Sequence, residues 1–225
     1  MKISVIAERI TKYHERGLRV FSTSSLQSQS VPLLHIISQT GCDIPVYFLN
    51  TGFLFPESLR FRDQIAREFN LRIITVHPVV PKIQQRGSNG RLLYGTDPDR
   101  CCYLNKVQPL EPILAAHDVW INGVRADQTA KRNAMRTEQA GPHDTLRYHP
   151  MLNWTGRDIH NYMRKYGLPQ HPLTAKGYLS IGCEPCTRRF VDGLDARSSR
   201  WYGMNKKECG LHTELVCDPL ASRRQ

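Results

Sequence analysis

Four of the seven cysteines fall into two close groups that could hold a metal. Cys101 and Cys102 are adjacent, and Cys183 and Cys186 form a Cys-x-x-Cys pair further along the chain. An odd cysteine count in a chain expected to be cytoplasmic argues against a disulfide framework and for metal or redox chemistry. Four thiolates would complete the coordination of zinc or of an iron–sulfur cluster. Because structural zinc sites use spaced pairs, the tandem cysteines favour a [4Fe–4S] cluster; zinc and a metal-free redox pair stay open.

A fifth cysteine, Cys209, stands in the polar pentapeptide Glu208-Cys-Gly-Leu-His212, directly after two lysines. A thiol close to cations and a histidine loses its proton more readily, and the thiolate is the nucleophilic form. The segment therefore predicts a candidate nucleophile. Taken alone, the pentapeptide is explained slightly better by an inert surface cysteine.

Hydroxyl side chains crowd the stretch from Ser22 to Ser30, which links an apolar segment to a helix with proline in its first turn. Backbone N–H groups at a helix N-terminus, with hydroxyls nearby, can bind phosphate or sulfate. The stretch lacks the Gly-x-x-x-x-Gly-Lys pattern of a P-loop. A capped helix start explains the serines as well, so the anion site is one of two interpretations.

The first half of the chain alternates apolar, strand-like segments with helical ones. The strand-like segments are residues 18–23, 46–49, 71–76 and 119–123, and the helical ones are residues 3–15, 32–38, 56–69 and 101–116. We expect Pro109 and Pro112 to break the last helix, and the polar residues 78–99 to form a long loop. Strands that alternate with helices predict an α/β fold with a doubly wound, mostly parallel sheet.

Ligands bind beyond the carboxyl ends of the strands in such a sheet. The serine stretch, Asn50-Thr51-Gly52 and residues 123–128 all follow predicted strands and would meet there. After about residue 150 the pattern changes, with a short helix expected near 154–162 and little periodicity from residue 167 onward. We expect one α/β domain over residues 1–194 and a flexible, polar tail over residues 195–225 that carries Cys209.

The 225 residues carry a formal net charge of +11, and 40% of them are hydrophobic. This composition supports a folded core, and no apolar run approaches the ~20 residues of a membrane-spanning helix. Charges near the N-terminus lie where a signal peptide needs its apolar part, so we expect a cytoplasmic protein with no membrane partner. Without basic blocks or a nucleic-acid-binding motif, the charge favours a small anionic substrate over nucleic acid. A homo-oligomer stays open.

Four segments, in order, resemble the adenylyl-sulfate/phosphoadenylyl-sulfate reductase family of assimilatory sulfate reduction. They are Cys101-Cys-Tyr-Leu-Asn-Lys106, Trp120-Ile-Asn-Gly-Val-Arg125-Ala-Asp127-Gln128, Gly177-Tyr-Leu-Ser-Ile-Gly-Cys183-Glu-Pro-Cys186 and Lys207-Glu-Cys-Gly-Leu-His212. The resemblance spans about residues 18 to 213. It implies an iron–sulfur member of the family, with the adenine-nucleotide α-hydrolase-like fold.

The resemblance also implies a mechanism. Cys209 would attack the sulfur of a sulfonucleotide, release AMP and become S-sulfocysteine, from which thioredoxin or a glutaredoxin-like reductant releases sulfite. A [4Fe–4S] cluster on Cys101, Cys102, Cys183 and Cys186 would act electrostatically rather than by electron transfer. The expected substrate-binding residues are Ser22, Thr23, Ser24, Ser25, Asn50, Thr51, Gly52, Lys106, Arg125, Arg197, Arg200 and His212. One departure is Gln27, which stands where the family often has glycine and where backbone approaches phosphate most closely.

Family members with four cluster cysteines typically reduce adenosine 5′-phosphosulfate, which is therefore the expected substrate. Phosphoadenosine phosphosulfate is the alternative, and its extra phosphate could be bound by Lys82, Arg86 or Arg91. An ATP pyrophosphatase of the same superfold is a weaker alternative, because its Ser-Gly-Gly-x-Asp-Ser loop is missing. A zinc-stabilised nucleic-acid binder would contain zinc rather than iron and show a steeply salt-dependent affinity.

Overall fold

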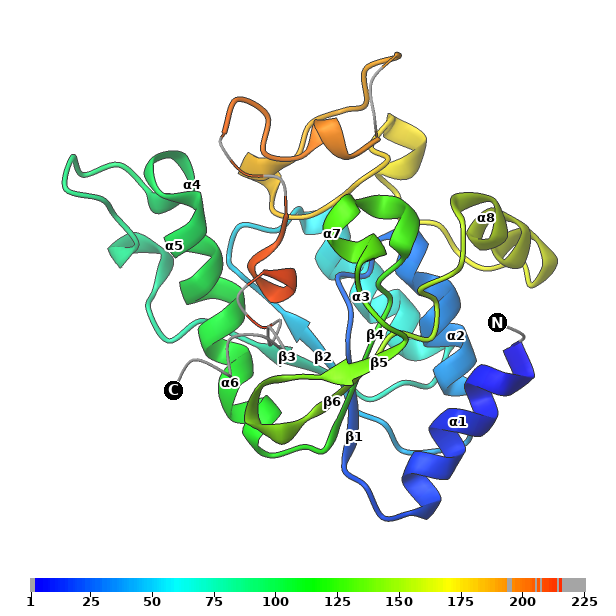
Figure 1. Cartoon of the computed structure of the whole chain (residues 1–225). Helices are drawn as coiled ribbons and strands as arrows, with labels where there is room; N and C mark the ends of the chain where they lie inside the picture. The colour runs from blue at the N-terminus through cyan, green and yellow to red at the C-terminus, as the bar shows by residue number, and fades with distance from the viewer. Residues whose placement is uncertain (1–2, 194–195, 205, 207, 214, 216–225) are drawn as a thin grey trace.

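The computed structural model describes residues 3–193, 196–204, 206, 208–213 and 215, and this part of the chain is built around one six-stranded sheet (Figure 1). The strands are β1 (Val20–Thr23), β2 (Val46–Leu49), β3 (Ile73–Val76), β4 (Val119–Asn122), β5 (Glu138–Ala140) and β6 (Leu146–Tyr148). They lie in the order β3-β2-β1-β4-β6-β5, with every neighbouring pair parallel except β5 and β6. This confirms the predicted α/β fold with a mostly parallel sheet.

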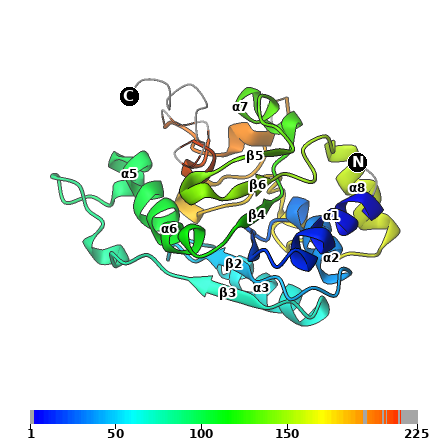
Figure 2. The same cartoon turned by 60° about the horizontal axis from the view of Figure 1, so that its bottom comes forward.

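Helices pack on both faces of the sheet, which makes it doubly wound (Figure 2). One face carries α1 (Ile3–Glu15), α2 (Val31–Ser38), α3 (Pro56–Glu68) and α8 (Gly156–Lys165), and the other carries α6 (Gln108–Ala115). Side chains alternate along a strand, so Val20 of β1 packs in the first core whereas Phe21 packs with Trp120 in the second. Because β1 and β4 are covered on both faces, each begins with apolar residues that point to either side: Val20 and Phe21 in β1, and residues 119–121 in β4. Within the described residues no helix is both long and apolar enough to cross a membrane.

The helical run that carries two of the grouped cysteines and Lys106 continues through both prolines, contrary to the predicted break. It consists of α5 (Pro98–Cys102), a π-helical turn (Tyr103–Val107) and α6. Pro109 is the second residue of α6, directly after the π-helical turn, and Pro112 is accommodated inside that helix. One helical run therefore holds the cysteines and the lysine in a fixed relation.

Several short elements were not predicted. β5 and β6 have three residues each, and β6 contains Arg147, whose side chain is fully buried. Such strands carry no apolar signal. The expected loop over residues 78–99 also contains a 3-10 turn (Lys82–Gln84) and a short helix, α4 (Leu93–Thr96).

From residue 167 onward the described chain forms only single 3-10 turns, as the lack of periodicity predicted. In Figure 1 this part, coloured yellow to red, crosses the edge at which the parallel strands end. Although it is polar, this part packs against the rest of the described structure, and four of its residues are buried: Trp201, Lys206, Glu208 and Leu215. The division at residue 194 and the flexibility of the tail stay predictions.

His171 gives the fold a testable acid sensitivity. The ring is buried; its Nδ1 accepts the Leu173 N–H at 3.2 Å, so Nε2 carries the proton and donates to Ser58 Oγ at 2.9 Å. Burial lowers the pKa of His171 to about 4. The unfolded chain, with an ordinary histidine pKa of about 6.5, therefore binds more protons than the folded chain between these two values. Stability contributed by neutral His171 is present above pH 6.5 and is lost as the pH falls toward 4.

We expect His171→Gln to reduce the loss of unfolding free energy between pH 7 and pH 5 by roughly 2 kcal/mol, since the variant no longer has this group to protonate. Urea denaturation at the two pH values measures the difference. His160→Gln, at an exposed histidine of α8, is the control. An identical pH dependence in wild type and His171→Gln would contradict the prediction.

Candidate active site

A cavity of about 160 Å³ lies at the carboxyl ends of β1 and β4. The chain leaves β1 toward β2 on one side and later returns to β4 on the other, so this is the switch point at which doubly wound sheets bind ligands. The end of β1 contributes Thr23, Ser24 and Ser25, and the end of β4 contributes Asn122 and Gly123. The rest of the lining comes from β2, the helical segments around Lys106 and Arg132, residues 181–183 and the described part of the tail.

The serine stretch is shaped by its own hydrogen bonds. Ser24 Oγ accepts the Leu26 N–H at 3.0 Å and donates to Ser30 Oγ at 3.2 Å, while Ser25 Oγ accepts from Gln27 Nε2 at 3.2 Å. Leu26 has a φ of 55°, in the region that glycine adopts without strain, and its side chain is fully buried. The glycine-like position of the stretch is thus Leu26 and not Gln27, whose φ is −72°.

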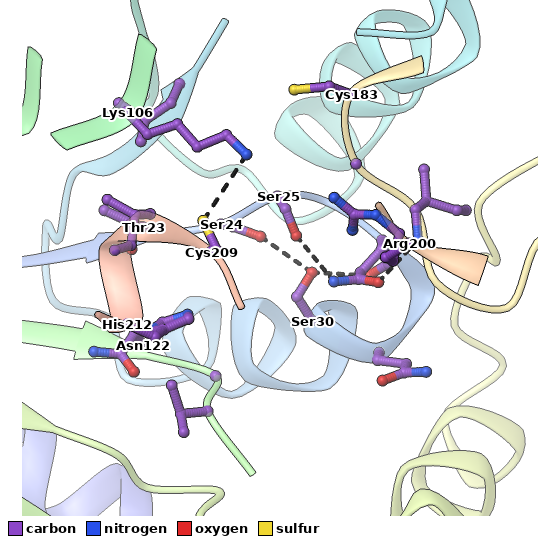
Figure 3. Close-up of a pocket in the computed structure, with 18 of the residues that line it drawn as sticks. Thr23, Ser24, Ser25, Ser30, Lys106, Asn122, Cys183, Arg200, Cys209 and His212 are labelled. Carbon is purple, nitrogen blue, oxygen red and sulfur yellow. Dashed lines mark hydrogen bonds between the residues drawn. The ribbon is translucent and has the colours of Figure 1, made fainter. Parts of the chain in front are cut away.

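Cys209 points into this cavity, with its Sγ 3.9 Å from Lys106 Nζ (Figure 3). Burial alone would raise the pKa of Cys209, but Lys106, the Leu211 N–H and Arg200 together lower it below the ordinary thiol value. Burial would likewise lower the pKa of Lys106, and the negative charges of neighbouring cysteines raise it instead. The positive charge of Lys106 therefore favours the thiolate form of Cys209.

Arg200 lines the same cavity and is held by the segment around the Cys-x-x-Cys pair. Its Nε donates to the Cys186 carbonyl oxygen at 3.1 Å, and its guanidinium lies 4.6 Å from the ring centre of Trp201. A Cβ at Gly182 would overlap the guanidinium. Glycine at that position therefore allows the close approach that fixes Arg200.

Arg197 and His212 complete the polar lining from the tail. Burial and the charge of Arg132 lower the pKa of Arg197 to about 10, which leaves it charged at neutral pH. His212 Nδ1 lies 3.4 Å from Arg147, and because arginine only donates, His212 Nε2 carries the proton of the neutral ring. Burial and the nearby arginines lower the pKa of His212 well below its usual range. Neutral His212 can thus donate one hydrogen bond into the cavity.

A smaller hollow beside the cavity is lined by all four grouped cysteines, Cys101, Cys102, Cys183 and Cys186, with Lys106 and Arg200. The six described cysteines are all free thiols. Within the described residues, no three Cys, His, Asp or Glu side chains converge as ligands of a single ion do. Four thiols around one hollow are a donor set that an iron–sulfur cluster can use.

Hydrogen-bond donors surround these sulfurs. Asn105 Nδ2 lies 3.6 Å from Cys101 Sγ, and Thr51 Oγ1 lies 3.3 Å from Cys183 Sγ. Burial first, and then neighbouring cysteines, raise the pKa of Cys101 to about 12 and that of Cys186 to about 11. A metal that binds these thiolates must displace their protons, and Lys106 and Arg200 would balance part of the resulting negative charge.

The structure brings most of the predicted site residues together, but not all. Thr23, Ser24, Ser25, Lys106, Arg197, Arg200, Cys209 and His212 line the cavity. Five others of the described chain lie outside its lining: Ser22, Asn50, Thr51, Gly52 and Arg125. The hydroxyl of Ser22 bonds the Ile121 carbonyl oxygen within the sheet at 3.0 Å.

The segment after β2 turns toward the cysteines instead of the cavity. Asn50 Oδ1 accepts the Gly52 N–H at 3.1 Å, which closes a tight turn, and Thr51 contacts Cys183. Arg125 lies one step behind the cavity, where its Nη1 donates to Gln29 Oε1 at 2.9 Å and its Nε pairs with Asp127 at 3.0 Å. It can therefore orient Gln29, which does line the cavity.

Sequence reasoning missed Gln29, Arg132 and Asn122, which all line the cavity. His149 Nδ1 donates to Asn122 Oδ1 at 2.6 Å, which fixes the amide, and Asn122 Nδ2 is buried without a partner among the described residues. A signal was present for Asn122, since it lies near the carboxyl end of the predicted fourth strand, residues 119–123, and is the last residue of β4. Arg132 offered none, because it becomes a cavity residue only through the fold.

This arrangement of side chains can bind a polyanion next to the Cys209 nucleophile. Cationic side chains and hydroxyls line a cavity at a nucleotide-type switch point, and a thiol with a lowered pKa faces into it. Thiolates attack electrophilic sulfur.

The fold is that of adenine-nucleotide α-hydrolase-like proteins. The phosphoadenylyl-sulfate reductase of Candida auris, in a phosphate complex, superposes with a TM-score of 0.67 over 81% of this chain and 90% of that one, at 18% identity. FMN adenylyltransferase of Candida glabrata gives a TM-score of 0.55 over 78% of this chain and 60% of that one, at 12% identity. At these identities the likeness concerns the fold alone.

Sequence comparison narrows the class to a family. Residues 19–189 match the family described as the phosphoadenosine phosphosulfate reductase domain. The chain is 37% identical to adenosine 5′-phosphosulfate reductase of Streptomyces coelicolor, over 87% of this chain and 83% of that protein. It is 34% identical to phosphoadenosine 5′-phosphosulfate reductase of Gloeobacter violaceus, over 93% and 87%. The chain belongs to the phosphoadenosine phosphosulfate reductase family and is one of its enzymes.

Proposed function

We propose that this protein reduces adenosine 5′-phosphosulfate to sulfite and AMP in the cytoplasm, for sulfate assimilation, with thioredoxin or a glutaredoxin-like protein as reductant. The observation that carries the proposal is the Cys209 thiol, 3.9 Å from Lys106 inside a cavity lined by cations. In a member of this family, a thiolate placed there faces the sulfur of a bound sulfonucleotide.

The first step is a displacement at sulfur. The Cys209 thiolate forms a bond to the sulfate sulfur, the bond from that sulfur to the bridging phosphate oxygen breaks, and AMP leaves with the electron pair. The enzyme is left as S-sulfocysteine. Lys106, Arg197 and Arg200 stabilise the charge on the sulfate and on the departing phosphate, and His212 Nε2 can donate to a sulfate or phosphate oxygen.

The second step needs an external dithiol. A thiolate of the reductant attacks Cys209 Sγ and sulfite leaves, so that a mixed disulfide links the two proteins. The second thiol of the reductant then releases Cys209 and closes a disulfide in the reductant. Because Cys209 lies inside the cavity, the tail has to move for this exchange, as the predicted flexible tail allows.

The four grouped cysteines would hold a [4Fe–4S] cluster. When bound, this group would supply charge next to Lys106 rather than electrons for the reaction. The substrate is bound by residues of this chain. Among them, Lys106 lines both the hollow of the cysteines and the cavity of Cys209, and so connects the two.

Adenosine 5′-phosphosulfate is the preferred substrate in this proposal because all four cluster cysteines are present. Phosphoadenosine phosphosulfate stays as the alternative, since relatives named for each substrate match at similar identity. The residues suggested for its extra phosphate do not support it: Lys82, Arg86 and Arg91 all lie outside the lining of the cavity. Arg86 donates to the Gly90 carbonyl oxygen at 2.6 Å within its own loop.

Sulfite release by anaerobically purified protein with thioredoxin tests the proposal, with the two sulfonucleotides at matched low concentrations. We expect faster release from adenosine 5′-phosphosulfate. Faster release from the 3′-phosphorylated substrate would keep the chemistry and overturn the substrate. No sulfite from either would overturn the function.

A further inference from the structure

Glu208, next to the candidate nucleophile, is the most extensively bonded carboxylate among the described residues at the site. Its Oε1 accepts from Arg132 at 2.7 Å, from Arg197 at 2.9 Å and from the Cys209 N–H at 2.9 Å. Its Oε2 accepts from Arg132 Nε at 2.9 Å and from Thr129 Oγ1 at 3.1 Å. One side chain therefore joins the loop before α7 (Ala130–Asn133), α7 itself and two parts of the tail.

These contacts are buried, which distinguishes them from an ordinary surface ion pair. The side chains of Glu208 and Arg132 are 7% and 8% exposed. Asp43 and Arg72 make the same two-pronged contact, at 2.8 and 3.0 Å, but with 72% and 51% exposure. A solvated pair of that kind contributes little, whereas breaking a buried one leaves a charge without compensation.

The contact also sets the position of Cys209. The Glu208 carboxylate accepts the Cys209 N–H, so the backbone at the nucleophile is tied to the same group that Arg132 grips. A second anchor lies beyond the cysteine, where Arg147 donates to the Leu215 carbonyl oxygen at 2.8 Å. Between these two anchors the Cys209 sulfur reaches Lys106.

We propose that Glu208 is a positioning residue that holds the tail closed over the cavity through Arg132, and that this contact must open before the reductant reaches Cys209. The second of these claims, that the contact opens for the reductant, rests on the proposed function. The Glu208–Arg132 contact, called the Glu208 latch below, keeps Cys209 in line for attack and restrains its exposure. When the latch opens, Arg132 and Arg197 lose their carboxylate, and this cost favours the closed tail.

Glu208→Gln tests the latch, because it keeps the size of the side chain and removes its charge. The first measurement is alkylation of Cys209 by iodoacetamide without substrate, followed by peptide mass spectrometry. It is made at the high-pH plateau, where the thiol is fully ionised and a changed pKa has no effect. We expect the Cys209 rate to rise by about 30-fold or more. The half-buried Cys42 should be unchanged, which excludes general unfolding.

The second measurement is the single-turnover rate at which Cys209 becomes S-sulfocysteine from adenosine 5′-phosphosulfate. Misplacement of a reacting group by about 1 Å can cost on the order of 100-fold, and we expect a loss of that size in Glu208→Gln. Glu208→Asp, which keeps the charge, should recover part of the rate. Asp43→Asn is the matched control, because it breaks the exposed carboxylate–arginine pair, and it should change neither rate.

Arg132→Gln and the double variant show whether Glu208 acts through Arg132. If it does, the double variant should label Cys209 no faster than the single variant with the larger effect. Unchanged labelling in Glu208→Gln, or equal acceleration at Cys42 and Cys209, would overturn the latch. Failure of the proposed function is a separate outcome: the wild type would then release no sulfite, while the labelling result would still decide the latch.

Discussion

Cys209→Ser should abolish sulfite release and leave nucleotide binding intact. A serine hydroxyl is essentially un-ionised near pH 7, so it is a far poorer nucleophile than the thiolate, and it cannot form the sulfur–sulfur bond of the intermediate. We expect turnover with thioredoxin to fall by on the order of 10⁴-fold or more, to background. Lys106, Arg197 and Arg200 remain in the cavity. Calorimetric titration with AMP should therefore give an affinity close to that of the wild type.

Mass spectrometry adds a direct reading of this prediction. Wild-type protein mixed with adenosine 5′-phosphosulfate, without reductant, should gain the mass of one sulfonate on the peptide that contains Cys209, and Cys209→Ser should not. Cys42→Ser, at a half-buried cysteine that lies outside the cavity lining, is the control and should behave as wild type. Turnover that survives in Cys209→Ser would remove this residue as the nucleophile.

The central strands and the first helices could be predicted because their sequence signal is local. β1, β2 and β4 are apolar and bounded by turn residues, and β2 has the predicted bounds, Val46–Leu49. β6 could not be found in this way, because its middle residue is Arg147. That arginine is buried, donates to the Leu215 carbonyl oxygen of the distant tail and lies 4.5 Å from the ring centre of Trp120 in β4. Hydropathy measures single residues and does not register such a partner.

Several cavity residues could be singled out from the sequence. Residue type alone indicated Cys209 and the serine stretch, the family resemblance indicated Lys106, and the fold places all three around one cavity. Asn50-Thr51-Gly52 also follows a strand, but the turn closed by Asn50 directs Thr51 toward Cys183. Position at a strand end thus predicts the edge of the sheet and not the direction of the side chain.

In the tail, composition failed to predict which charged residues are buried. Its polar composition predicted a segment without a core, yet Glu208 is buried among arginines, and Lys206 is buried with its ammonium on Asp99. Charged groups can be buried when each one has a partner, and those partners come from α5 and α7, which are distant in sequence. Only the folded structure shows that the charges of the tail match those of the body.

Loss of iron in Cys186→Ala is the other large effect that we expect. Cys186 is one of four cysteines that line one hollow. It is the last residue of a 3-10 turn, Glu184–Cys186, and its N–H donates to the Cys183 carbonyl oxygen at 3.0 Å. Removal of groups that merely support a metal ligand already costs about 10- to 100-fold in metal affinity. Loss of a ligand itself should exceed that, so iron and acid-labile sulfide should fall at least about tenfold in anaerobically purified protein.

The identity of the metal and the number of its ligands are separate outcomes of this experiment. Zinc in place of iron in the wild type would overturn the cluster, and unchanged iron in Cys186→Ala would overturn the four-cysteine assignment. Thr51→Val is a graded comparison, because it removes a hydroxyl 3.3 Å from Cys183 Sγ and keeps all four thiols. It should retain most of its iron. Cys42→Ser should retain all of it, since Cys42 lies outside the lining of the hollow.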